Sequence, residues 1–218
     1  MLYSNSRKLS LCGWLQKNDG SAYRSPLRLQ KFLFLYEAFS KVDNDVSDFT
    51  RLKGDKRGPV FSPVWGDYTK DRAEFDKKSL EIYNTERDTI NNLRAQRASF
   101  IVSSLSENEL SDLTHQFNIW NAKRQPIMAG EQQVELNESD FNELDFTITR
   151  TLEQMYPAEI VQNCSVIAIG EKFFVFLKKD IKFLTEQHFD TMASLSDHED
   201  LHNPVYVEVD HEGRLCID

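Results

Sequence analysis

The segment from Ser25 to Phe39, SPLRLQKFLFLYEAF, most constrains the fold because it predicts a helix that must be buried on nearly every side. A serine N-cap followed by proline at the first helical position is a common helix start, and Ser25 and Pro26 fit it. The apolar positions, which repeat at i, i+3, i+4 and i+7 and are widened by further neighbours, are Leu29, Phe32, Leu33 and Tyr36, with Leu27, Phe34 and Leu35. A helix apolar nearly all round belongs in the middle of a domain.

Helical patterns on both sides of this segment predict a helical body. Ser106 and Glu109 fit a capping box that starts one helix, and Asn137 is expected to cap another, which Pro157 ends. The body is further expected to contain helices over 6–17, 110–120 and 141–155, and one long helix or two over 65–93, continued through 98–106. Weak strands are expected at Phe49 and Val60–Phe61, and a loop over 121–133.

The last 60 residues have a different character. CSVIAIGEKFFVFLKK consists of two β-rich runs around Gly170, which predicts a hairpin. DIKFLTEQHFDTMASL predicts an amphipathic helix with Phe183, Leu184, Phe189 and Met192 on its apolar side, and NPVYVEVDHEGRLCID predicts a second hairpin. We therefore expect a mainly α, overall α+β chain: a helical body over 1–156 and a small α+β module of two hairpins and a helix over 157–218.

Composition narrows the cellular setting. The chain has 218 residues, no run of about 18 apolar residues and no long apolar segment near its start, so we expect a cytoplasmic protein without a membrane partner. Its cysteines, Cys12, Cys164 and Cys216, are few and far apart, which favours reduced thiols over disulfides or a zinc site. No metal or cofactor is expected.

The net charge of −9 is unevenly distributed. Residues 1–73 hold 13 basic against 8 acidic side chains, whereas residues 74–218 hold 13 against 27. Such an acidic surface repels nucleic acid and attracts a partner with a basic surface. A solvated acidic surface that serves solubility explains the same pattern equally well.

KGDKRGPVFSPVWGDY, from Lys53 to Tyr68, predicts a fixed corner between a loop and a helix. Gly58-Pro59 turns the chain or extends it, and Ser62-Pro63 matches a helix start. Trp65 and Tyr68 would then lie three positions apart on neighbouring parts of one helix face. Both aromatics either meet a partner or fill the core.

Catalytic motifs are absent from the sequence: there is no Walker A loop, dinucleotide fingerprint, nucleophile elbow or His-Glu-x-x-His. His198 and His202 would share a face for zinc if helical, and with His115 they define a metal-enzyme alternative, but an exposed acidic loop is the stronger interpretation. His115 alone fits a core or interface histidine better than a general base. Lys53, Lys56 and Arg57 suit phosphate, yet no nucleic-acid-binding motif accompanies them.

Three segments carry a resemblance when they are taken in order: LQKFLFLYEAF (29–39), RGPVFSPVWGDY (57–68) and LSDLTHQFNIW (110–120). Together they resemble the Panacea family, the SocA-like antitoxin domain of bacterial and phage toxin–antitoxin pairs. The resemblance covers about residues 6–146. The family's aromatic-x-Ala-Trp signature before Gly-Pro-Val is replaced here by FTRLKGDKRGPV, and the tail after Pro157 lies outside the resemblance.

The resemblance implies a mostly helical domain without catalytic activity that neutralises a cognate toxin by direct binding. The alternative is an adaptor that delivers a toxin to a protease, or a phage or prophage protein that contacts a host protein. The residues that we expect to form the partner site are Lys53, Arg57, Gly58, Pro59, Val60, Trp65, Tyr68, His115 and Trp120.

Overall fold

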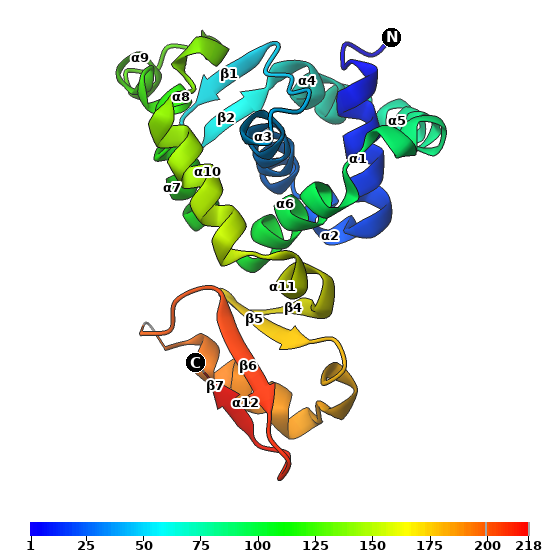
Figure 1. Cartoon of the computed structure of the whole chain (residues 1–218), viewed down its shortest axis with the longest axis vertical. Coiled ribbons are helices and arrows are strands. Elements are labelled where there is room, and N and C mark those ends of the chain that lie inside the picture. The colour runs from blue at the N-terminus through cyan, green and yellow to red at the C-terminus, as the bar shows by residue number, and fades with distance from the viewer. Residues whose placement is uncertain (199, 218) are drawn as a thin grey trace.

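A single buried helix, α3 (Pro26–Val42), forms the centre of the body in the computed structural model, which describes residues 1–198 and 200–217. The Ser25 hydroxyl accepts a hydrogen bond from the Arg28 amide, and Pro26 is the first helical residue, so the predicted start is confirmed. The apolar side chains from Leu29 to Leu35 are at most 1% exposed. Figure 1 shows the other body helices arranged around α3.

The surrounding helices follow the predicted regions with different breaks. The capping box of Ser106 and Glu109 is formed, but the helix that it starts ends at His115, and a separate short helix carries Trp120. The region from Trp65 to Leu93, expected as one long polar helix or two, is divided into several helices. The body helices besides α3 are α1 (Ser6–Asn18), α2 (Gly20–Arg24), α4 (Ser62–Lys70), α5 (Arg72–Glu86), η1 (Arg87–Thr89), α6 (Asn92–Ser104), α7 (Glu107–His115), α8 (Asn118–Asn121), α9 (Arg124–Met128), η2 (Glu138–Asp140) and α10 (Glu143–Met155). The short helix α11 (Ala158–Asn163) follows beyond the expected boundary at residue 156.

Two expectations for residues 121–142 are wrong. The predicted loop over 121–133 contains α9, and the short strand β3 (Val134–Glu135) follows it directly. Asn137 does not cap α10; Asn142 does, because its side chain accepts the Leu144 amide while the Asp145 carboxylate accepts the Asn142 amide. The cap of α10 therefore lies five residues later than predicted, after the single turn η2.

A three-stranded antiparallel sheet packs against α3. Its order is β2 (Gly58–Phe61), β1 (Leu52–Asp55), β3, and Leu52 pairs with Phe61. The strand predicted at Phe49 starts three residues later, and the one at Val60–Phe61 starts earlier, at Gly58. The amide of Phe61, on the outer edge of β2, donates to Gln30 Oε1 of α3 at 2.8 Å, which fixes the sheet on the central helix.

The C-terminal part has the predicted two hairpins and a helix. Its sheet has the order β4-β5-β6-β7, with the two hairpins joined by a parallel pairing of β5 and β6. Phe189 and Phe183 were predicted on the apolar side of the helix, but both are exposed, and Met192 is the buried residue. The elements are β4 (Cys164–Ile169), β5 (Lys172–Leu177), η3 (Ile181–Phe183), α12 (Glu186–Ser196), β6 (Val205–Val209) and β7 (Leu215–Ile217).

Strand β5 contributes to two hydrophobic clusters. Phe174 and Phe176 pack with Met192 in a cluster confined to the C-terminal part. Val175 points the other way and belongs to the main core, while the Arg28 guanidinium lies 5.0 Å from the ring centre of Phe173. The C-terminal sheet therefore lies between the body and α12.

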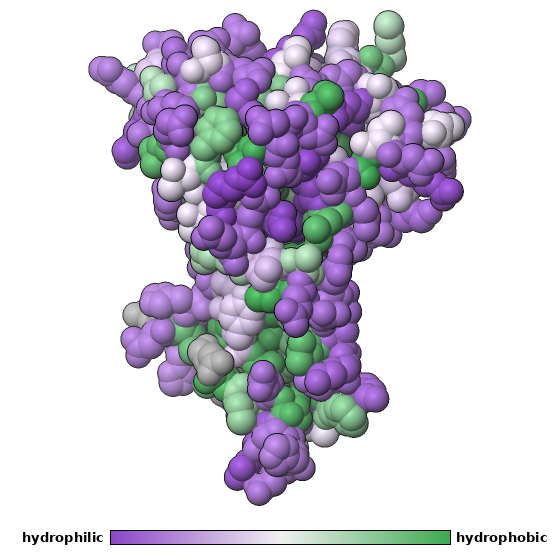
Figure 2. Space-filling model, in the orientation of Figure 1, coloured by the Kyte–Doolittle hydropathy of each residue, from purple (hydrophilic) through white to green (hydrophobic). Residues whose placement is uncertain are grey.

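The described part of the chain is mainly helical with two small sheets, which confirms the predicted fold class. Every helix within residues 1–198 and 200–217 is too short or too polar to span a lipid bilayer. Figure 2 shows a mostly hydrophilic surface over the body, with apolar residues gathered around the junction with the C-terminal part and below it.

Candidate functional site

The turn between β1 and β2 is held by side chains from three separate segments of the body. Lys31 of α3 donates its ammonium hydrogen to the carbonyl oxygen of Arg57. The indole Nε1 of Trp120 donates to the carbonyl oxygen of Asp55 at 3.0 Å. The His115 ring stacks on that indole, with centroids 3.9 Å apart and planes 21° from parallel. The turn is thus fixed at both of its ends.

Gly58 makes this close packing possible. Its φ is +103°, in the region that favours glycine, and an added Cβ would overlap Lys31 Nζ and Thr114 Oγ1. The three segments 29–39, 57–68 and 110–120, which are distant in the sequence, therefore meet at one point. The buried Gly58 and Pro59 shape the turn rather than face solvent.

Lys31 is the least expected charge in the molecule. Its side chain is buried, and within the described residues no carboxylate forms an ion pair with it. Burial lowers the pKa of Lys31 to about 7; nearby Asp55 opposes this shift and nearby Arg57 reinforces it. The amine is therefore close to the point where it gains or loses its proton at neutral pH.

His115 shares this environment. Burial, and then the charge of Lys31, lower the pKa of His115, while Asp112 and the backbone of Lys56 act in the opposite direction. Its Nε2 is buried and has no hydrogen-bond partner among the described residues. His115 is therefore a half-buried histidine packed on the buried Trp120, and its buried Nε2 is unpaired among the described residues.

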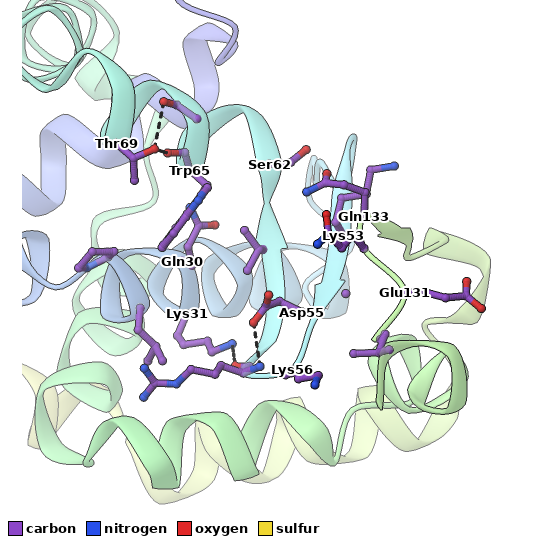
Figure 3. Close-up of a pocket in the computed structure, with 18 of the residues that line it drawn as sticks. Gln30, Lys31, Lys53, Asp55, Lys56, Ser62, Trp65, Thr69, Glu131 and Gln133 are labelled. Atoms are coloured by element: carbon purple, nitrogen blue, oxygen red, sulfur yellow. Dashed lines mark hydrogen bonds between the residues drawn. The ribbon is translucent and has the colours of Figure 1, made fainter. Parts of the chain in front are cut away.

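A cleft of about 780 Å³ opens beside the turn. Figure 3 shows Trp65 close to Gln30 on one side, Lys53 and Gln133 on the other, and Lys31 reaching from α3 toward the turn. The charged residues that line the cleft are Lys31, Lys53, Lys56, Arg57 and Lys70, with Asp55, Glu107 and Glu131. Basic groups outnumber acidic ones here, in a chain of net charge −9.

Trp65 and Tyr68 have different roles, contrary to the expectation that they share one. Trp65 lines the cleft and is 45% exposed. Tyr68 is 6% exposed, and its hydroxyl donates to the carbonyl oxygens of Tyr23 and Arg24 at 2.9 and 3.0 Å. Three positions on a helix turn the side chain by about 60°, enough to cross from the surface to the core.

The predicted cap at Ser62 is also wrong. Phe61 occupies the N-cap position of α4 without a side-chain hydrogen bond, and Pro63 is the second helical residue. The Ser62 hydroxyl instead donates to the Arg51 carbonyl at 3.3 Å. The corner is fixed by strand pairing and by Gln30 rather than by a local cap.

The metal-enzyme alternative required His198 and His202 to lie on one helix, and the described residues do not show this. His198 and His202 lie outside any helix, so they do not share a helix face; Glu199 between them lies outside the described residues. Within residues 1–198 and 200–217, no three His, Cys, Asp or Glu side chains are grouped to hold a metal ion.

Sequence reasoning placed Lys53, Arg57, Val60, Trp65, His115 and Trp120 around one site, and the structure brings them to the turn and the adjoining cleft. It missed Lys31, Gln30 and Thr114. The available signal for Lys31 was a lysine inside an otherwise apolar helix, where an unpaired charge is costly.

Comparison with protein-family models, with curated proteins and with solved structures found no match for this chain.

Proposed function

We propose that this protein is a cytoplasmic antitoxin that binds a cognate protein toxin and blocks it by occlusion, without a catalytic step of its own. The observation that carries the proposal is the meeting of Lys31, Gly58 and Thr114 at one turn. These residues come from the three segments on which the Panacea resemblance depends. Segments far apart in the sequence thus lie together at one turn, and this supports a shared role for them.

The geometry sorts the expected partner residues into two groups. Lys53, Arg57 and Trp65 line the open cleft, which supports a contact between them and a partner. Gly58, Pro59, Tyr68 and Trp120 are buried and hold the shape of that surface. Val60 also lines the cleft, and the half-buried His115 packs on Trp120. A half-exposed tryptophan beside a basic rim is typical of residues that dominate binding energy.

Charge suggests how a toxin would be oriented. The cleft carries an excess of basic side chains, so the toxin segment that enters it should carry carboxylates. The acidic residues beyond position 73 suit a basic surface elsewhere on the same toxin. A partner with both features would bind in one orientation, and a protease adaptor would need a further surface for the protease.

Co-expression with the product of the neighbouring gene tests the proposal. We expect the full chain to restore the growth of cells that the neighbouring gene's product inhibits, and to co-purify with that product. Trp65→Ala should weaken both effects. Phe183→Ala is the matched control because Phe183 is 57% exposed but lies in the C-terminal part, away from the cleft. Failure of the full chain to restore growth, or restored growth without a complex, would contradict the proposal.

A further inference from the structure

The cleft beside the β1–β2 turn has a cation at its base that the fold leaves incompletely paired. Lys31 is 1% exposed yet lines the cleft. Its ammonium group has three hydrogens, and within the described residues it donates one of them, to the Arg57 carbonyl. A buried ammonium with spare donors is costly unless another acceptor satisfies it.

Other cations around the cleft have weak partners. Lys53 Nζ lies 3.9 Å from Glu135 Oε2, and both side chains reach solvent. Lys56 and Lys70 form no ion pair with another described residue, whereas Arg57 pairs with Glu107 at 3.0 Å. Five basic side chains thus line the cleft with three acidic ones, and this excess favours a ligand with more than one negative charge.

The opposite side of the cleft offers a flat aromatic surface. Trp65 is 45% exposed there and lies close to Gln30, whose amide carbonyl already accepts the Phe61 amide. Gln132 and Gln133 also line the space and add amide groups. A volume of about 780 Å³ lies within the range of small-molecule sites, roughly 300–1,000 Å³.

We propose that this cleft binds a nucleotide, with its phosphates near Lys31, Lys53 and Lys56 and its base against Trp65. A terminal carboxylate would use one or two of these cations and leave the tryptophan unused. A long RNA strand would have to pass Glu107 and Glu131 at the cleft and the acidic surface beyond it. A compact, multiply charged ligand with a planar ring uses all of these features.

Bound phosphate would also change the protonation of Lys31. The charged and titratable groups that face its amine are Asp55, Arg57 and His115. Because burial holds the pKa of Lys31 at about 7, an adjacent phosphate would favour the protonated amine and draw a proton from solution. Nucleotide binding should therefore be accompanied by proton uptake near pH 7.5.

Titration calorimetry on the full chain tests the proposal, with ATP, GTP, tripolyphosphate and adenosine as probes. We expect ATP or GTP to bind, tripolyphosphate to bind more weakly, and adenosine to bind more weakly still. Trp65→Ala should weaken nucleotide binding about fivefold or more, as loss of base stacking does, and leave tripolyphosphate unaffected. Phe183→Ala should change neither.

Charge variants provide the second measurement. The double variant Lys53→Gln, Lys56→Gln should weaken ATP binding about tenfold, whereas Lys77→Gln, an exposed lysine on α5, should not change it. Lys31→Met should abolish the buffer-dependent heat that reports proton uptake. If Lys31→Met does not fold, the double variant decides alone.

Three results would overturn the proposal. One is the absence of binding for ATP and GTP at millimolar concentration. Another is equal affinity for tripolyphosphate and nucleotide together with no effect of Trp65→Ala, which would mean a bare anion site. The third is a single-stranded RNA that binds more tightly than both nucleotides and displaces them. All three are measured without a toxin, so they leave the antitoxin proposal untouched.

Discussion

The amine of Lys31 lies in the space that a Cβ on residue 58 would occupy, so the central helix and the β1–β2 turn approach each other only because residue 58 is glycine. This contact ties the buried charge to the turn through the Arg57 carbonyl. The same contact links the stability of the body to the shape of the cleft.

Gly58→Ala should therefore destabilise the protein by about 2–4 kcal/mol, since it adds backbone strain at a positive φ to overpacking against Lys31 and Thr114. Urea unfolding monitored by circular dichroism measures the change. Gly66→Ala is the matched control: an added Cβ there meets no atom within 4 Å, and Gly66 lies inside α4. Alanine at that helical position should stabilise by about 0.5–1 kcal/mol. Equal effects at the two glycines would contradict the packing described here.

Lys31 should make stability depend on pH in the neutral to alkaline range. Its pKa is lowered to about 7 in the folded protein, while an unfolded lysine titrates near 10.4, so the unfolded chain binds more protons between these values. The cost of burying the charge is full below pH 7 and disappears as the pH rises toward 10. Wild type should therefore gain stability relative to Lys31→Met by up to about 1.4 kcal/mol per pH unit in this window.

Chemical denaturation of wild type and Lys31→Met at several pH values between 6 and 10 measures that difference. The variant also lacks the hydrogen bond to Arg57. This loss adds an offset to the free energy of unfolding, and the offset does not vary with the protonation of other groups. Lys77→Met serves as the control because the Lys77 side chain is 71% exposed, and its curve should run parallel to that of wild type. If the curve of unfolding free energy against pH for Lys31→Met also runs parallel to that of wild type, the pKa of Lys31 is not shifted in the folded protein.

Glu37→Ala should cost about 3–5 kcal/mol of unfolding free energy. The Glu37 carboxylate is buried on α3 and accepts hydrogen bonds from Lys8 Nζ at 2.5 Å and from Arg7 at 2.9 Å. Its removal leaves the buried Lys8 charge without its closest partner. Glu81→Gln, which breaks an exposed pair with Lys78, should change stability by no more than about 1 kcal/mol. Thermal unfolding of both variants tests the contrast.

Asn203→Ala should loosen the C-terminal part from the body. The Asn203 amide donates to Glu109 Oε2 at 3.0 Å and to the Glu171 carbonyl at 2.9 Å, and its oxygen accepts the Phe173 amide. We expect faster hydrogen exchange at the Phe173 amide and along β5, because partly buried groups lose their partners. Exchange limited to residues next to 203, with β5 unchanged, would show that this link does not restrain the sheet.

Local signals explain the parts of the fold that the sequence predicts well. The start of α3, the capping box at Ser106 and the hairpin at Gly170 each depend on a few neighbouring residues. The failures depend on distant contacts. Tyr68 turns inward because the carbonyls of Tyr23 and Arg24 accept its hydroxyl, and nothing within 62–70 indicates this.

The candidate site shows the same division. The corner at Gly58-Pro59 is visible in the sequence as a break, but its close approach to Lys31 depends on how α3 crosses the sheet. Trp120 was singled out for its place in a motif, whereas its bond to the Asp55 carbonyl became visible only in three dimensions. The cleft itself has no local signal, since its lining comes from five separate stretches of chain.

Strand β5 turns Val175 toward the body and Phe174 and Phe176 toward α12, and this two-sidedness limits how the chain can be rearranged. Truncation or fusion at Pro157 would remove the sheet that packs on the body and expose apolar side chains of α6, even though the sequence there predicts a domain boundary. Any shortened relative of this protein would need polar replacements on that face before it could exist alone.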